Sequence, residues 1–99
     1  MYRPERLYDR SMPLSVTAFE STPNPNAIKC MVSPPTGERV RSYFNPDQAA
    51  GDELARALFA IPGVTNVLIH TSFITVGKAP GSPWAPVKAH IKRVLREHG

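Results

Sequence analysis

Polar and apolar residues alternate along two early runs of the chain, 14–21 (LSVTAFES) and 26–32 (NAIKCMV). This two-residue period is typical of a β-strand with one buried face. The residues that share the apolar faces of these two runs are Leu14, Val16 and Ala18 in the first and Ile28, Cys30 and Val32 in the second.

A third run, RVRSYF (39–44), alternates in the same way. Its pattern predicts a strand with Val40 and Phe44 facing the core. The residues expected to face solvent are Arg39, Arg41 and Tyr43. The turn-forming stretch SPPTGE precedes it, so we expect three strands joined by short turns.

The period changes to that of a helix in residues 51–63 (GDELARALFAIPG). Asp52 is a suitable N-cap, and the Pro-Gly pair at 62–63 ends the helix. The apolar stripe expected to face the core is formed by Leu54, Leu58 and Ile61.

Two further β-rich runs, 64–70 and 72–78, are separated by one residue and predict a tight hairpin. A final helix is expected from Ser82 as N-cap and Pro83 as first residue, or from Ala85 if Pro86 delays its start. Its buried face comprises Trp84, Val87, Ile91 and Val94 or Leu95.

The resulting order, βββαββα, predicts an α+β fold. We expect a two-layer sandwich with a mostly antiparallel or mixed sheet and both helices on one face. Residues 1–13 show no clean period and predict a flexible arm, so the folded unit is a single domain over 14–99.

Composition places this domain outside the membrane and secreted classes. The chain has 99 residues, one cysteine and no apolar run near the ~20 residues of a membrane span. Its first residues lack the apolar core of a signal peptide, so we expect a cytoplasmic protein.

The net charge of +4 is concentrated at the end of the chain. Four cations lie there against one acid, Glu97, which suits an acidic partner but is also ordinary for a helix C-terminus. An anion- or nucleic-acid-binding domain is therefore an alternative function, although no aromatic residue interleaves the cations as base stacking requires. The residues of this alternative site are Lys88, Lys92, Arg93 and Arg96.

The residues that catalysis or metal binding needs do not form any common set. Cys30 lies in the apolar register of its strand, where burial makes a thiol unreactive. The three histidines, at 70, 90 and 98, have no metal-ligand spacing with one another or with Cys30. We therefore expect no enzymatic activity and no metal site, with a metal or redox role for Cys30 kept as the last hypothesis.

The stretch TPNPN (22–26) has two interpretations. Its prolines predict a stiff, extended connector, with Asn26 able to adopt the left-handed region that turns the chain into the next strand. It is either a rigid corner that satisfies its own polar groups, or a rigid loop that presents Asn24, Asn26 and Lys29 to a partner.

Three motifs in this order, TPNPNAIK, LARALFAIPGV and SFITVGK, with a closing helix that carries Trp84 and Lys88, resemble the Nfu/NifU N-terminal domain family. The resemblance covers residues 14–98 and implies the same βββαββα fold. It also implies a role near iron–sulfur cluster assembly, where a second domain with a C-x-x-C motif holds the cluster. The 99 residues contain no such motif, and Cys30 stands where the family usually has an aromatic residue.

The resemblance therefore implies a non-catalytic accessory or interaction module in iron–sulfur cluster assembly or delivery. We expect a monomer that binds no cluster itself, because a cluster needs about four ligands, commonly thiolates, and the chain offers one cysteine. The expected partners are an assembly scaffold, a C-x-x-C Nfu-type protein or an apo-protein that requires a cluster; nucleic acid is not favoured, and no membrane is expected. The residues predicted to bind a partner are Asn24, Asn26, Lys29, Lys78 and Lys88.

Overall fold

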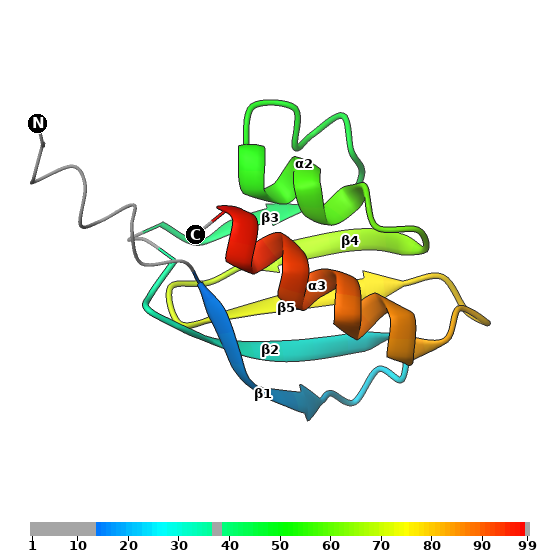
Figure 1. Cartoon of the computed structure of the whole chain (residues 1–99). Coiled ribbons are helices and arrows are strands. Elements are labelled where there is room, and N and C mark those ends of the chain that lie inside the picture. Colours follow the sequence, from blue (N-terminus) through cyan, green and yellow to red (C-terminus); the bar gives the residue numbers. More distant parts are fainter. Residues whose placement is uncertain (1–13, 37–38, 99) are drawn as a thin grey trace, which may run out of the picture.

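The fold is a five-stranded antiparallel sheet covered on one face by two helices, as the alternation predicts (Figure 1). The computed structural model describes residues 14–36 and 39–98, so the predicted arm lies outside the described residues. The elements are β1 (Ser15–Ser21), β2 (Ala27–Ser33), β3 (Arg41–Tyr43), α2 (Glu53–Phe59), β4 (Val64–Ile69), β5 (Phe73–Lys78) and α3 (Trp84–His98).

The strand order is β1-β2-β5-β4-β3, with every neighbouring pair antiparallel. The expectation of three consecutive strands joined by short turns is therefore wrong for the third, because β3 lies at the far edge from β2. The chain is held on this route by Thr36, whose amide and hydroxyl donate to the carbonyls of Thr71 and His70 at the β4–β5 hairpin, at 2.8 and 2.6 Å.

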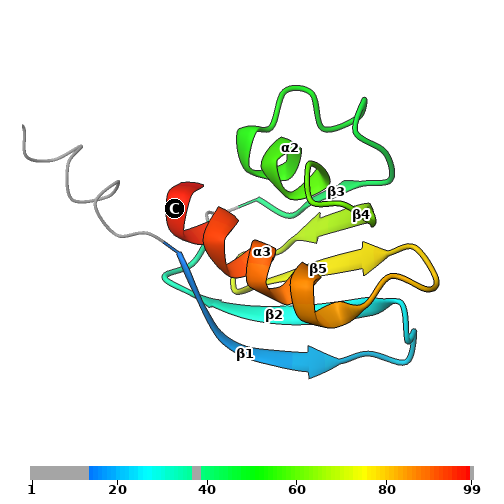
Figure 2. The ribbon, with the colours of Figure 1, turned by 45° about the vertical axis from the view of Figure 1, so that its right-hand side comes forward.

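Both helices lie on the same face of the sheet, with α3 over its middle and the β1 side and α2 near β3 and β4 (Figures 1 and 2). The helix stripes predicted from the sequence form the core against the inward strand residues. Leu58, Ile91 and Leu95 have no exposed surface, and neither do Cys30, Ile69 and Ile74 beneath them. Neither helix in the described part of the chain is long and apolar enough to cross a membrane.

The register of β1 departs from simple alternation. A bulge between Val16 and Ala18 shifts the pairing with β2, so that Thr17 has no partner residue. One extra residue reverses the face of every side chain that follows it. Phe19, and not Ala18, therefore packs against the core on the helix side, while Ala18 is exposed.

The expected faces of β3 are reversed. Val40 and Phe44 are 55% and 71% exposed, whereas Tyr43 packs against the core. The physical reason is Asp52, the N-cap of α2, whose carboxylate accepts from Arg41 Nε at 2.8 Å and from the Tyr43 hydroxyl at 2.9 Å. A polar group on the helix side thus holds the two residues that alternation placed in solvent.

The ends of the helices follow the predicted signals closely. Asp52 Oδ1 accepts from the Ala55 amide at 3.2 Å, which caps α2. Gly63, with φ of 94°, takes the left-handed conformation that leads the chain into β4. Helix α3 begins at Trp84, between the two starts that the prolines allowed.

Candidate functional site

The TPNPN stretch is a turn that binds its own polar groups. The Thr22 hydroxyl lies 2.8 Å from the Asn24 carbonyl oxygen and accepts from the Asn24 amide, while Asn24 Oδ1 accepts from the Asn26 amide at 2.9 Å. The Ala27 amide donates to the Asn24 carbonyl at 3.0 Å and closes the turn. The extended connector predicted for residues 22–25 is thus wrong at Asn24 and Pro25, which belong to the turn. Asn26 is not left-handed, because no described residue other than glycine has a positive φ.

Two side chains from elsewhere lock this turn onto the start of α3. Trp84 Nε1 donates to the Pro25 carbonyl at 3.2 Å, and Lys78 Nζ donates to Asn26 Oδ1 at 3.2 Å. Lys78 is 8% exposed, and its Nζ lies 5.0 Å from the centre of the Trp84 ring. Half-buried Trp84 therefore docks the helix, and Asn26 and Lys78 are occupied by this lock.

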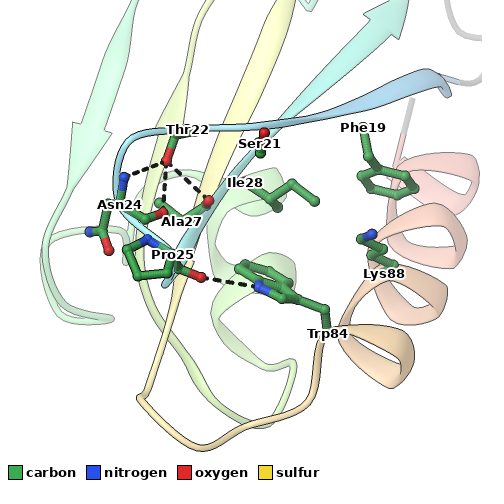
Figure 3. A pocket seen from close by; sticks show the side chains of 9 residues that line it. All are labelled: Phe19, Ser21, Thr22, Asn24, Pro25, Ala27, Ile28, Trp84 and Lys88. Carbon is green, nitrogen blue, oxygen red and sulfur yellow. Dashed lines mark hydrogen bonds between the residues drawn. The ribbon is translucent and has the colours of Figure 1, made fainter.

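A pocket of about 370 Å³ opens beside the lock, between the turn, β1 and α3 (Figure 3). Its lining combines the aromatic rings of Phe19 and Trp84 with the ammonium group of Lys88 and the polar atoms of Thr22 and Asn24. In Figure 3, Lys88 lies close to the Phe19 ring; its Nζ is 5.2 Å from the ring centre.

A second pocket, also of about 370 Å³, continues along the same seam at the other end of β1. Phe19 links the two pockets, because Lys92 Nζ also lies over its ring, 5.7 Å from the centre. The lining of this second pocket is Leu14, Ser15, Val16, Lys92 and Arg96. We call the two pockets together the β1–α3 groove.

The groove is positively charged and its cations lack acidic partners in the described part of the chain. Lys88, Lys92 and Arg96 line it, whereas the single ion pair among residues 14–36 and 39–98 is Arg41–Asp52. Arg93, on another side of α3, contacts His90 through Nη2 and Nδ1 at 3.0 Å and lines a pocket with α2 residues.

The structure divides the predicted partner-binding residues among three places. Asn24 and Lys88 line the groove, and Asn26 and Lys78 form the lock. Lys29 lies on the other face of the sheet, where its Nζ is 4.4 Å from the centre of the Phe73 ring. Sequence reasoning missed Phe19, because the bulge that turns it inward leaves no mark in the alternation.

The only cysteine is unsuited to cluster ligation. Cys30 has no exposed surface, and burial raises the pKa of its thiol to about 12 despite the opposing charge of Lys88. An iron–sulfur cluster takes about four ligands, mostly thiolates. No three His, Cys, Asp or Glu side chains of the described ranges lie together as a metal site would require.

Comparison with known proteins agrees with this fold. Residues 16–99 match the family described as "Scaffold protein Nfu/NifU N terminal". A NifU-like protein of Schizosaccharomyces pombe is 35% identical over 83 residues, which is 80% of this chain and 32% of that protein. A mitochondrial NFU1 iron-sulfur cluster scaffold homolog of Drosophila erecta is 28% identical over 79% of this chain and 28% of its own length.

A solution structure of a NifU-like protein from Saccharomyces cerevisiae has the same fold, with a TM-score of 0.71 and 23% identity over 98% of this chain and 82% of that one. The chain spans about a third of the length of the curated relatives it matches. The family match covers the whole described sheet and both helices from Val16 onward, and the chain therefore belongs to the Nfu/NifU N-terminal scaffold family.

Proposed function

We propose that this domain is a non-catalytic interaction module of iron–sulfur cluster assembly or delivery, which binds a protein partner through the β1–α3 groove. The observation that carries the proposal is the groove itself: two aromatic rings and three cations that meet no acid within the described residues. Cations without partners beside accessible apolar surface are typical of a surface that binds an acidic protein.

The link to iron–sulfur assembly rests on family membership and on the name of the Drosophila relative. The proposed partners are an assembly scaffold, a C-x-x-C Nfu-type protein or an apo-protein that requires a cluster. In this proposal the cluster is cargo held by the partner, since the one thiol here is buried and protonated. The cytoplasmic location and the monomeric state remain predictions.

The experiment that tests the proposal measures binding of the purified chain to each of the three partner classes by isothermal titration calorimetry. Iron and sulfide are assayed anaerobically in the same samples, with Cys30→Ala as a variant. We expect saturable binding to one class, weakened by a charge-removing change in the groove, and no cluster on the chain alone. Absence of binding to all three classes, or a cluster that requires Cys30, would overturn the proposal.

One feature of the structure favours the alternative function, nucleic-acid binding. Phe19, which is distant from the cations in the sequence, lies under both Lys88 and Lys92. An aromatic ring among cations is the arrangement that binds single strands. Such binding would weaken steeply as salt rises, because each neutralised phosphate releases counterions. Titration with a labelled oligothymidylate at low and high salt tests this alternative.

A further inference from the structure

The outer edge of β1 carries backbone groups that no described strand uses. The order β1-β2-β5-β4-β3 gives β1 one neighbour, β2, along the seven residues Ser15–Ser21. The opposite edge strand, β3, has only three residues. A row of unpaired N–H and C=O groups is a template for another strand unless proline, lysine, a bulge or a covering element protects it. Strand β1 contains neither proline nor lysine, and beyond its one bulge, between Val16 and Ala18, the pairing is regular from Ala18 to Ser21.

The cations of the groove follow this edge. The pocket at the end of β1 includes Lys88, and the pocket at its start includes Lys92 and Arg96, so α3 runs antiparallel to β1. The three cations are four residues apart, which corresponds to about 6 Å along a helix axis. Alternate residues of a strand are spaced by roughly 6.6–6.8 Å. Acidic residues at every second position of an added strand would therefore have nearly the same spacing as the cations, so each could lie opposite one of them.

The other face of β1 limits where the acids of such a strand can lie. Glu20 is exposed and pairs with Lys29, whose side chain lies on the face away from the helices. An acid on that face of an added strand would be repelled by Glu20. A strand that alternates acidic and neutral residues, with its acids on the helix side, meets both conditions.

We propose that the partner of this domain is bound through an extended acidic segment that adds to the sheet as a sixth strand beside β1. The backbone of β1 supplies hydrogen bonds, and Lys88, Lys92 and Arg96 select carboxylates at alternate positions. This mode, in which main-chain bonds give affinity and side chains give specificity, is common in peptide recognition. The inference rests on the proposed function and names the chemistry by which the partner is recognised.

The test uses the full chain and a synthetic peptide of about eight residues that alternates glutamate with valine. Binding is measured by calorimetry, and hydrogen exchange of the β1 amides is followed by NMR. We expect saturable binding and slowed exchange within Ser15–Ser21. A peptide with glutamine for glutamate should bind roughly tenfold or more weakly, since each exposed ion pair contributes about two- to fivefold.

Backbone methylation separates strand addition from simple charge attraction. One peptide is methylated on every glutamate amide and another on every valine amide, and each loses the N–H groups of one strand edge. In one strand direction only one of these edges can face β1, and the reverse direction presents the other edge, so the peptide that keeps the parent's affinity also reports the direction of the added strand. We expect one methylated peptide to bind like the parent and the other to lose binding. Equal affinity of both for the chain would overturn strand addition.

Charge variants of α3 test the selecting residues. Lys92 and Arg96 are exposed, so Lys92→Gln with Arg96→Gln should fold normally and weaken peptide binding about fivefold or more. Arg93→Gln removes one positive charge, against two in the double variant, from the same helix but away from the groove, and it should change affinity less than twofold. Equal losses in the two variants would show a general effect of net charge and overturn the inference.

Failure of this inference can be told apart from failure of the proposed function. If a partner protein binds and is weakened by the Lys92→Gln, Arg96→Gln change but leaves the exchange of the β1 amides unaltered, the function stands and strand recognition falls. If the peptide binds as expected while no assembly protein does, the recognition stands and the proposed pathway falls. Tighter binding of an oligothymidylate than of the peptide, or self-association through β1 in sedimentation, would overturn the peptide as the occupant.

Discussion

The two edges of the sheet differ in whether their charged side chains are paired within the domain. At the β3 edge a short strand is tied to α2, because Asp52 accepts from both Arg41 and Tyr43 while it caps the helix. At the β1 edge a strand of seven residues lies beside α3, and the helix residues nearest to it are cations without an acidic partner among the described residues. The same sheet thus has one edge that satisfies its charges internally and one that does not.

This difference suggests that the charged residues that stabilise the domain are not the ones that bind a partner. Charges that are bound internally hold elements together, and their loss costs stability. Charges that face only solvent contribute little to stability and are available to a partner. We therefore expect loss of the charges at the β3 edge to destabilise the domain, and loss of the groove cations beside β1 to change binding alone.

The largest effect on stability should come from the core under α2, which supports the β3 edge. Leu58 has no exposed surface, so Leu58→Ala should lower the free energy of unfolding by about 2–5 kcal/mol. Urea denaturation measures this loss. Leu54→Ala, at a half-buried position of the same helix, is the matched control and should cost clearly less. Similar losses for the two leucines would contradict the difference in burial between them, and an unchanged stability of Leu58→Ala would show that the helix stripe is misplaced.

The next effect should come from Asp52. Asp52→Ala removes the N-cap and leaves Arg41 and Tyr43 without their acceptor, and we expect a loss of about 2–3 kcal/mol in urea denaturation. Asp52→Asn keeps a capping group and should cost roughly half as much. If neither change destabilised the domain, the contrast between the two edges would fail.

The pH dependence of stability should carry the signature of the same carboxylate. Burial raises the pKa of Asp52, but the hydrogen bonds from Ala55, Tyr43 and Arg41 outweigh it and hold the pKa below its ordinary value of 3.8. The stabilisation is therefore present above pH 3.8 and is lost as the pH falls below it through the native pKa. The difference between wild type and Asp52→Asn in urea denaturation should shrink over that acid range, and a difference that persists there would contradict this assignment.

A smaller effect is expected at the lock beside the groove. Trp84→Phe keeps an aromatic ring but removes the bond from Nε1 to the Pro25 carbonyl, which should cost about 1 kcal/mol in thermal or urea denaturation. The turn should then loosen, seen as faster amide exchange at Asn26 and Ala27. Unchanged exchange would show that the turn holds itself through Thr22 and Asn24 alone.

The smallest effect, essentially no chemical modification of the native chain, is expected at Cys30. This buried residue of β2 pairs with Phe19 of the groove. Its raised pKa of about 12 keeps the thiol protonated, so iodoacetamide at neutral pH should not alkylate the native chain, as measured by mass spectrometry. The urea-unfolded chain is the control and should react fully. Because the native pKa is raised from 9.0, the stability linked to this thiol is present below pH 9.0 and is lost as the pH rises through about 12.

The helices could be predicted from the sequence because the signals that start, stop and orient a helix come from neighbouring residues. The Asp52 cap, the Pro62-Gly63 stop and the apolar stripe of α2 were all predicted from neighbouring residues, and the structure confirms them. The placement of β3 at the far edge was not predicted, because strand order depends on long-range pairing that alternation does not encode.

The candidate site was harder to predict because it, too, depends on contacts between residues far apart in the sequence. The sequence predicts Lys88 and Asn24 as site residues, but the groove also needs Phe19, which a bulge turns toward α3. The reversed faces of β3 depend on Asp52, whose carboxylate is reached only when α2 folds back over the sheet. Both errors came from treating a strand as if its own alternation decided which side is buried.

Trp84 is the only tryptophan of the chain, and it forms one wall of the groove through the contact with Pro25. Its intrinsic fluorescence therefore reports on the place where binding is proposed. A ligand without tryptophan that enters the groove would change the surroundings of that one fluorophore, so occupancy could be read from the unlabelled, unmodified protein.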